Sequence, residues 1–367
     1  MTGRERILMA IDRGQPDVVP IWELAFNEAS IVGLAKHFMD ESKLPEVKFF
    51  GDMDGTELLQ LVEAFFAVAR ELDLDGASAV STAPTERVDD KHIRDEKGVV
   101  HHLSELGMPY PVDGPIKEPG DLKGYKLPAV NDADFFLIDL ARSRFPEKAV
   151  SFMMQGPFAI SWGLRGSIEK LMMDYIENPG LVHDLSRMTT DYCLECVEKI
   201  AAKGADFIVI ECDVAFKNGP MMSPAQFADY VGQYYKEIVD HAHKKGLKAI
   251  KHSDGVLNSL IPAIIDAGFD GIHPIQPQCM DIGETKREFG DRLCIVGNID
   301  CANLLVFGTP DDVRRSVKET IAVAAPGGGY IISSSNTIHP GVKPENYIAM
   351  VEAARKYGKY PELANVE

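Results

Sequence analysis

The chain has 367 residues, of which 45% are hydrophobic and 26% charged, a balance typical of a globular protein with a large buried core. Its formal net charge of −18 argues against a nucleic-acid partner, because binding to phosphate backbones depends on clustered lysine and arginine side chains. No apolar run approaches the roughly 20 residues that a membrane-spanning helix needs. The six cysteines are scattered and no signal-peptide pattern follows Met1, so we expect a cytoplasmic protein with reduced thiols.

The N-terminal part of the chain mixes helical and extended patterns. Thr2 is a suitable N-cap for a helix over residues 4–12. Residues 18–21 have the pattern of a short buried strand, and residues 56–72 form the clearest amphipathic helix. Residues 75–81 then predict a second strand.

A different pattern occupies residues 87–106. Residues 92–94 and 99–103 alternate between apolar and polar side chains around a turn at 95–98, which predicts an antiparallel hairpin. Prolines and glycines from Gly107 to Pro128 then predict an irregular connector. We interpret residues 1–128 as an N-terminal extension with a hairpin excursion, within one domain that covers the whole chain.

Six further apolar runs have the length of buried strands and are separated by helical patterns, as in βα units. These strands are expected at residues 150–154, 207–210, 247–250, 269–272, 293–296 and 330–332. The helices are expected at residues 168–177, 179–203, 224–245, 257–267, 281–289 and 310–324. Together with 18–21 and 75–81 this predicts an α/β fold with eight strands, a (β/α)8 TIM barrel. An open dinucleotide-binding sheet is disfavoured, because no G-x-G-x-x-G follows any strand.

Polar side chains follow five of these strands at the point where each one ends. The clearest case is residues 247–250, which run into His252, Asp254 and Gly255. Glu211 and Asp213 follow the strand over 207–210 in the same way. Because the carboxyl ends of barrel strands meet at one face, we expect a shared site there.

The residue types at these strand ends favour a metal site. His252 and Asp254 are ligands that suit zinc, and His273 is a third candidate at the next strand end. Alternatively, His252 and Asp254 bond to each other and cap a helix. Glu211 and Asp213 are candidates for acid–base work or metal support, since two carboxylates in one cavity raise each other's pKa. Their alternative role is local, with Asp213 capping a loop and Glu211 pairing with a lysine.

Several motifs resemble the uroporphyrinogen decarboxylase superfamily and fall in its order along nearly the whole chain. They are Thr2 to Arg6, Pro16 to Pro20, Gly156-Pro157-Phe158, Asp213 to Gly219, Ser223-Pro224, His252 to Gly255, Gly297 to Asp300 and Pro344-Glu345-Asn346. The resemblance implies a single barrel domain. It leaves the reaction open, because the superfamily contains both decarboxylases and corrinoid-dependent methyltransferases.

Two departures from the superfamily's patterns bear on the reaction. The decarboxylases carry arginines that bind porphyrinogen carboxylates, whereas the corresponding segment here, residues 22–26, contains none. The methyltransferases hold zinc with an H-x-C pair and a later cysteine. His252 matches that histidine, but Asp254 stands at the first cysteine and Asn336 lies near the later one. The resemblance to the methyltransferase branch thus implies zinc with oxygen ligands in place of sulfur.

Oxygen and nitrogen ligands leave zinc a stronger Lewis acid than thiolates do, which suits an oxygen-bound methyl group. The hypothesis is therefore an O-demethylase methyltransferase that passes the methyl group of a small methoxylated, aromatic substrate to the Co(I) corrinoid of a partner protein. Its predicted zinc ligands are His252, His273 and a carboxylate, Asp254 or Glu211. Asp213 or Glu211 is expected to manage the proton of the leaving group.

The substrate is expected to contact apolar and amide side chains around the barrel mouth. The predicted contacts are Phe26, Phe158, Trp162, Phe216, Asn298, Asn336 and His339. The alternatives are a decarboxylase of a small or tetrapyrrole carboxylic acid and a non-catalytic barrel that binds a corrinoid or tetrapyrrole. The methyl donor could also be an amine, a thioether or methanol. Superfamily relatives imply a monomer or a homodimer.

Overall fold

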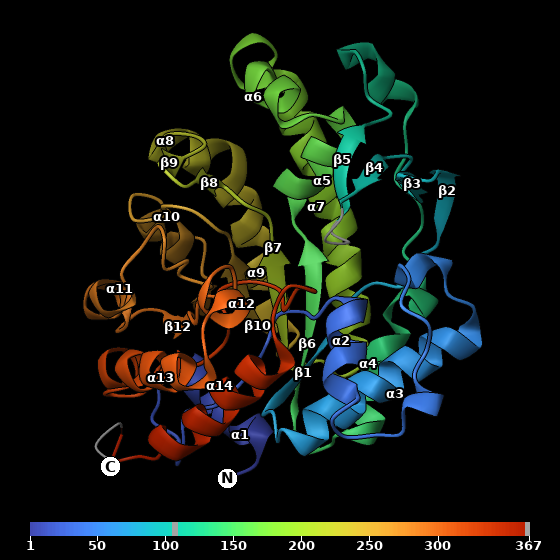
Figure 1. The fold of residues 1–367 in the computed structure, drawn as a ribbon. Helices are drawn as coiled ribbons and strands as arrows, with labels where there is room; N and C mark the ends of the chain where they lie inside the picture. Colours follow the sequence, from blue (N-terminus) through green and yellow to red (C-terminus); the bar gives the residue numbers. More distant parts are fainter. Residues whose placement is uncertain (105–108, 364–367) are drawn as a thin grey trace.

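A curled sheet of parallel strands forms the centre of the computed structural model, which describes residues 1–104 and 109–363 (Figure 1). Seven strands pair in the order β1-β6-β7-β10-β11-β12-β13. Their bounds are β1 Gly76–Ala79, β6 Ala149–Gln155, β7 Phe207–Glu211, β10 Lys248–His252, β11 Gly271–His273, β12 Cys294–Val296 and β13 Tyr330–Ile331. Each lies within the predicted strand or within three residues of its ends.

The segment between α1 (Gly3–Ile11) and α2 (Glu28–Ala35) occupies the eighth position and closes the barrel. Its backbone bonds to β13 on one side, with Ile332 N donating to Pro20 O at 3.0 Å. On the other side, Asp75 N donates to Ile21 O at 2.9 Å, directly before β1. The predicted strand over 18–21 therefore takes its expected place, although through isolated bridges instead of a continuous ladder. The (β/α)8 barrel prediction is confirmed.

Helices surround the sheet and connect its strands. Their bounds are α1 Gly3–Ile11, α2 Glu28–Ala35, α3 Gly55–Glu71, α4 Phe136–Arg144, α5 Pro157–Arg165, α6 Ile168–Glu177, α7 Pro179–Ala202, α8 Pro224–Phe227, α9 Gln233–Lys244, α10 Ile261–Asp266, α11 Ile282–Phe289, α12 Leu304–Phe307, α13 Pro310–Ala324 and α14 Pro344–Tyr357. Proline begins α5, α7, α8, α13 and α14, where its missing N–H costs no hydrogen bond. The helix predicted over 224–245 is interrupted by a π-helical turn at Ala228–Gly232.

Alternation along the strands separates two buried layers. One cluster fills the barrel interior and contains Trp22, Phe207, Val209, Ile250, Cys294 and Ile331 together with Ile7, Ala10 and Ile11 of α1. The intervening strand residues, such as Ile208 and Ile272, pack outward against the helices. Helix α1 thus covers the amino-terminal end of the barrel, and the opposite, carboxyl end is the mouth.

The predicted hairpin is part of a larger antiparallel sheet. Its four strands are β2 Thr85–Asp89, β3 His92–Asp95, β4 Val100–Leu103 and β5 Pro109–Asp113. The expectation of an irregular connector after residue 106 is wrong for β5, whose Pro109 and Pro111 lie on an edge strand, where prolines remove no ladder bond. Gly107 lies outside the described residues. A further two-stranded ribbon, β8 Ala215–Phe216 and β9 Gly219–Pro220, follows β7.

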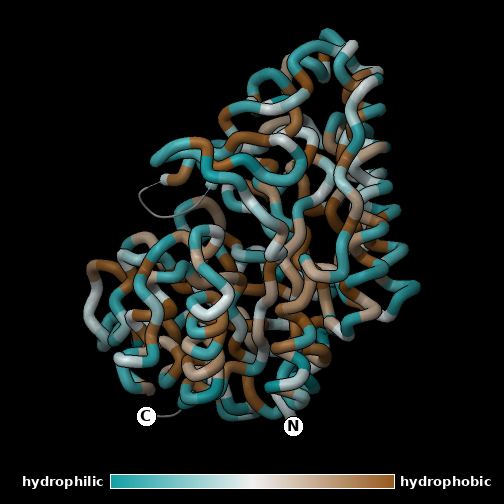
Figure 2. The backbone as a smooth tube through the Cα atoms, turned by 90° about the vertical axis from the view of Figure 1, so that its right-hand side faces the viewer, coloured by the Kyte–Doolittle hydropathy of each residue, from teal (hydrophilic) through white to brown (hydrophobic). Residues whose placement is uncertain are grey.

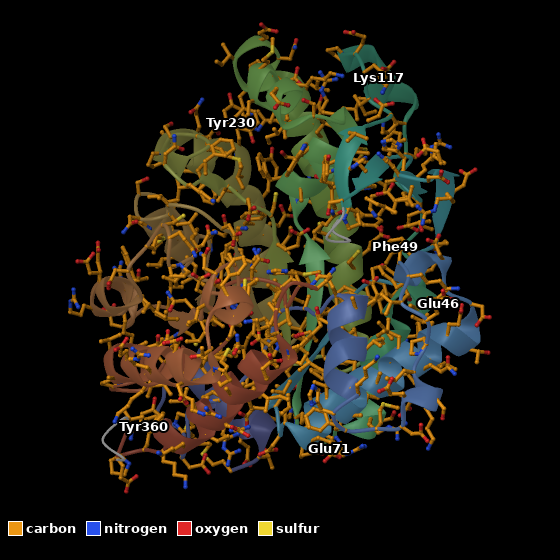
Figure 3. All side chains as sticks on the ribbon, in the orientation of Figure 1. Glu46, Phe49, Glu71, Lys117, Tyr230 and Tyr360 are labelled. Carbon is orange, nitrogen blue, oxygen red and sulfur yellow. The ribbon has the colours of Figure 1, made fainter. Side chains whose placement is uncertain are left out.

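The two ends of the molecule can be followed in the figures. Tyr230 and Lys117 lie toward the end at which the β6 and β7 arrows point, whereas Glu71 and Tyr360 lie at the opposite end (Figure 3). Hydrophobic segments concentrate in the interior and hydrophilic ones on the outer loops (Figure 2). In the described residues, no helix is both long and apolar enough to cross a membrane.

Candidate functional site

Strand register brings four polar side chains to one level at the barrel mouth. Gln155 of β6 pairs with Glu211 of β7, Glu211 with His252 of β10, and His252 with His273 of β11. Residues paired in this way on adjacent parallel strands point to the same face of the sheet. The four side chains therefore form a continuous row facing the interior, at the end where barrel enzymes place their chemistry.

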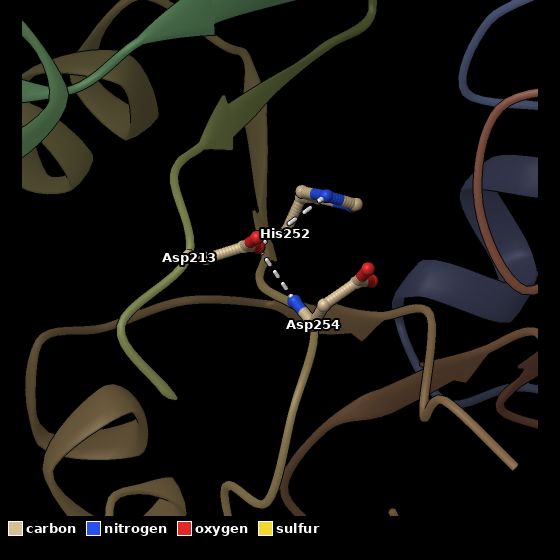
Figure 4. A group of neighbouring side chains, drawn as sticks. All are labelled: Asp213, His252 and Asp254. Atoms are coloured by element: carbon tan, nitrogen blue, oxygen red, sulfur yellow. Dashed lines mark hydrogen bonds and ion pairs between the residues drawn. The ribbon is translucent and has the colours of Figure 1, made fainter. Parts of the chain in front are cut away.

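Asp213 and Asp254 join His252 from the loops that follow β7 and β10. Ligand atoms of these three residues all lie within 4.8 Å of one another. The Asp213 carboxylate is 4.0 Å from His252 Nε2 and accepts a 2.8 Å hydrogen bond from Asp254 N (Figure 4). That backbone bond ties the two loops together, so the second carboxylate is placed by the first.

The electrostatics of the cluster follow from burial and from carboxylate repulsion. Desolvation lowers the pKa of His252 to about 4, so its imidazole is neutral at pH 7. Desolvation, followed by the nearby Asp213 charge, raises the pKa of Asp254 to about 7. Glu211 also has its pKa raised to about 7, first by desolvation and then by Asp213. The site is therefore short of positive charge.

His273 contacts His252 and is not part of the group that His252 forms with Asp213 and Asp254. Its Nδ1 is 2.8 Å from His252 Nδ1, and its fully buried ring packs edge-on against Trp22 at 5.7 Å between centroids. Burial, and then His252, hold the pKa of His273 well below its usual value. A bond at Nδ1 leaves His252 Nε2 directed at Asp213.

Lys251 faces away from the site, because it sits between two inward-facing positions of β10. Its fully buried Nζ donates to the Cys212 carbonyl at 2.7 Å and to the carbonyl of His252. It also lies 5.4 Å from the centre of the Tyr235 ring. Lys251 thereby holds together the carboxyl ends of β7 and β10.

Asn336 reaches the cluster from the loop after β13. Its Nδ2 donates to Asp254 Oδ2 at 2.7 Å, while its Oδ1 accepts from Thr337 N at 2.6 Å. The same loop bonds to Glu23, to which the sequence assigned no role. Glu23 comes at the end of the first barrel segment as Glu211 comes at the end of β7, so its position at a strand end was a signal that could have found it.

The four aromatic residues expected around a substrate ring lie in different surroundings. Phe26 lines an apolar cavity of about 130 Å³ beyond β1, between α2, α3 and α4. The lining also includes Leu24, Ala25, Glu28, Ile31, Phe50, Leu58, Leu61, Val62, Phe65, Phe66, Ser78, Val80, Thr82, Leu137 and Ala141. Phe158 is buried in the layer between strands and helices, Trp162 packs against that layer, and Phe216 is 53% exposed on β8. The structure therefore does not assemble these four rings into one cage.

Asn298 and His339 make contacts within the loops of the mouth. Asn298 Nδ2 donates to Ile275 O at 2.8 Å, and the residue borders an open hollow formed with residues 277–282. His339 bonds through Nε2 to Cys301 O at 3.0 Å, and its Nδ1 accepts from Gly341 N. Both ring nitrogens of His339 are thus engaged in shaping its own loop.

A parallel barrel with imidazole and carboxylate groups gathered at its mouth defines the class of this protein, a TIM barrel whose candidate site lies at the carboxyl ends of its strands. The family model described as uroporphyrinogen decarboxylase (URO-D) matches residues 100–357. The chain belongs to the URO-D family.

Relatives in this family carry two different activities in their names. The methylcobamide:CoM methyltransferase MtaA of Methanosarcina barkeri is 26% identical over 257 residues, covering 69% of this chain and 71% of that protein. A uroporphyrinogen decarboxylase of Coxiella burnetii is 24% identical over 372 residues, covering 96% and 95%. A solved methyltransferase from Methanosarcina mazei has the same fold, with a TM-score of 0.73 at 19% identity over 97% of this chain and 99% of that one.

Proposed function

We propose that this protein is a methyltransferase that moves a methyl group from a small methoxylated aromatic compound to the Co(I) corrinoid of a partner protein, with zinc as Lewis acid. The observation that carries the proposal is the convergence of one neutral imidazole and two carboxylates at the barrel mouth. Similarity to a methylcobamide:CoM methyltransferase supports corrinoid methyl transfer as the class of reaction.

The cluster has the features of a zinc site. The neutral form of His252 is the one that binds a metal. Asp254 Oδ1 is buried and has no hydrogen-bond partner in the described part of the chain. A cation between Asp213 and Asp254 would relieve the repulsion that raises the pKa of Asp254. We therefore assign His252, Asp213 and Asp254 as zinc ligands. We assign His273 a different role, which is to orient His252 without binding zinc itself.

The reaction requires the methyl carbon–oxygen bond to break as a carbon–cobalt bond forms, with the bonding pair of the first left on the aryl oxygen. When bound, zinc supplies Lewis acidity at that oxygen. The oxygen also needs a proton. Glu211, whose pKa is raised to about 7 and which is paired with His252 in register, is the acid we assign to deliver it.

The cavity around Phe26 supports an aromatic methyl donor. Its volume of about 130 Å³ is comparable with the roughly 150 Å³ of an apolar protein cavity that binds benzene. The cavity wall is also connected to the metal cluster. Ile338 N donates to Ala25 O at 3.0 Å, and Asn336, two residues earlier, holds Asp254.

Filling this cavity is expected to impair the reaction with aromatic substrates without changing the affinity for zinc. Val80 lines the cavity just after β1, so Val80→Phe is expected to lower kcat/KM for methoxyarenes by about tenfold or more, by displacing the ring. Steady-state kinetics and zinc affinity measure the two effects separately. The matched control is Val88→Phe on the exposed face of β2, which should leave both unchanged. Equal kinetics for the two variants would remove the cavity from the substrate site.

The function itself is tested by metal analysis followed by a methyl-transfer assay. Purified protein is expected to hold about one zinc ion per chain, and His252→Ala should lose most of it. Methoxylated aromatics are then incubated with the protein and a reduced corrinoid protein, and methylation of the cobalt is followed by absorbance. Decarboxylation of a small carboxylic acid by the metal-free protein, or absence of methyl transfer from every methoxyarene, would contradict the proposal.

A further inference from the structure

Glu23 is a buried acid at the mouth that the proposed chemistry does not use. Its side chain is 3% exposed and lies on the segment that closes the barrel. Ser334, just after β13, donates from its backbone N to both carboxyl oxygens of Glu23, at 3.0 and 3.1 Å. The Ser334 hydroxyl lies 2.7 Å from Glu23 Oε2. Glu23 is thus bound on one side to the loop that carries Asn336.

The Ser334 hydroxyl has two oxygen neighbours but only one proton. Its Oγ is 2.6 Å from the Asn336 carbonyl oxygen, which can only accept a hydrogen bond. One proton can satisfy only one of these two short contacts, so the other contact needs a second proton. A protonated Glu23 carboxyl supplies it by donating to Ser334 Oγ, whereas an ionised carboxylate would leave the two acceptors competing for a single proton.

The surroundings of Glu23 agree with a neutral carboxyl. Desolvation raises the pKa of Glu23 to about 8, against the lowering effect of Ser334 and of the nearby Tyr347 hydroxyl of α14. The other titratable neighbour is Cys301, whose thiol has its own pKa raised to about 11 by burial. Neither neighbour is charged at pH 7.

The contacts continue from Ser334 to the proposed metal ligands. The Asn336 carbonyl is held by Ser334, its amide oxygen by Thr337 N, and its amide nitrogen donates to Asp254 Oδ2. The amide is therefore fixed at both ends before it reaches Asp254. We propose that Glu23 is a positioning residue that, as a neutral acid, holds Asp254 in place through Ser334 and Asn336. The zinc part of this inference rests on the proposed function.

Three variants test whether Glu23 acts as a neutral hydrogen-bond donor. Glu23→Gln keeps the shape, and its amide can donate to Ser334 Oγ while accepting from Ser334 N. Glu23→Ala and Ser334→Ala each break the chain of contacts. Glu71 is an exposed glutamate at the far end of the molecule, and Glu71→Gln is the control for loss of one acidic group (Figure 3). Thermal unfolding of every variant establishes that it is folded.

Two measurements need no metal. The infrared difference between wild type and Glu23→Gln at pH 7 is expected to contain the carbonyl band of one protonated carboxylic acid, which is lost when the pH is raised above about 9. Crystal structures are expected to keep the contact between Asn336 and Asp254 in Glu23→Gln and to lose it in Glu23→Ala and Ser334→Ala. Absence of the band, or an unmoved Asp254 in both disrupting variants, would overturn the inference whether or not the protein binds zinc.

The third measurement is zinc affinity, by chelator competition between pH 6 and 9.5. Glu23→Gln should stay within about threefold of wild type at pH 7, while Glu23→Ala and Ser334→Ala lose about tenfold. Wild-type affinity should decline above about pH 8 as Glu23 ionises, and Glu23→Gln should lack that decline. If wild type binds no zinc, the proposed function fails but the two metal-free measurements still decide the role of Glu23. If wild type binds zinc and Glu23→Gln behaves like Glu23→Ala, the inference fails alone.

Discussion

Proton competition at single residues should control metal binding by this site. Asp254 has its pKa raised to about 7, so below that pH a proton must leave before the carboxylate can bind zinc. His252, with a pKa of about 4, is already neutral and adds no pH dependence near neutrality. Apparent zinc affinity should therefore rise by about tenfold per pH unit up to pH 7 and then level off, until Glu23 ionises above about pH 8.

Zinc titrations at pH 5.5, 6.5 and 7.5 measure this slope. Asp254→Asn should bind more weakly and show little slope below pH 7, because the titrating group is gone. Asp300→Asn is the matched control, since Asp300 also follows a barrel strand but bonds to Ala302 N and Asn303 N in its own loop. If zinc affinity in Asp254→Asn still rises with pH as in wild type, the proton that competes with zinc belongs to another group.

The two histidines of the site should differ in what they contribute. His252→Ala removes a ligand and should abolish tight zinc binding. His273→Ala removes only the partner of His252 Nδ1, so affinity should fall by about 10- to 100-fold with the stoichiometry retained. Chelator competition and metal analysis together distinguish these results. Loss of all zinc in His273→Ala, with its fold intact, would restore the direct ligation predicted from the sequence.

At the scale of elements, one tight turn after β10 places Asp254. Gly255 has φ +92°, and a Cβ there would lie 2.7 Å from the Phe216 carbonyl oxygen and 2.8 Å from the carbonyl carbon of Ala215. Gly255→Ala should therefore cost about 1–3 kcal/mol of unfolding free energy and also weaken zinc binding, because the loops from β7 and β10 must separate. Urea unfolding and zinc titration measure the two effects.

Gly246 provides a matched comparison before the same strand. It has φ +83°, but no atom lies within 4 Å of an added Cβ. Gly246→Ala should show the cost of the backbone conformation alone, about 1 kcal/mol, with unchanged zinc affinity. If Gly255→Ala behaves in the same way, the close approach of the two loops does not matter for the metal site.

Elements were predictable from sequence to the extent that hydrophobic periodicity determines them. The apolar runs of β7 and β10, each ending in polar residues, placed Glu211 and His252 at the mouth, and the strand predicted over 18–21 is where the barrel closes. Periodicity carries no information on how loops fold back. The contact of Asp213 with Asp254 N therefore became visible only in the structure, and the structure groups Asp213 with His252 where the sequence favoured His273.

Side chains on helices were predicted less well than those on strands, for the same reason. Phe158 and Trp162 belong to α5, and which face of a helix meets the sheet depends on tertiary packing. Phe26 lies on an extended segment and does line a cavity. Glu23 lies in the segment 22–26, which in the sequence was notable only for its lack of arginine, so its bond to Ser334, 311 positions away, could not be anticipated.

At the scale of the whole molecule, the contacts that close the barrel and the candidate site lie at opposite ends of it. At the amino-terminal end, buried Asp75 accepts hydrogen bonds from Ile21 N at 2.8 Å and from Arg6 at 3.1 Å, and it forms an ion pair with Arg355 at 2.9 Å. These contacts join the closing segment, α1 and α14 to the start of β1. The carboxylate thus holds the first and last parts of the chain at the point where the barrel closes.

Replacing Asp75 should therefore destabilise the fold without changing the mouth. In Asp75→Asn, the amide oxygen can still accept from Ile21 N, but the NH2 group then faces the partly buried Arg6, so the loss should be about 1.5–3 kcal/mol. Asp17→Asn removes a more exposed partner of Arg6 and should cost about 0–1 kcal/mol. Urea midpoints measure both, and zinc affinity at pH 7.5 should equal that of wild type in each. A weakened metal site in folded Asp75→Asn would show that the two ends are coupled, because the ligand loops would then depend on how tightly the barrel is closed.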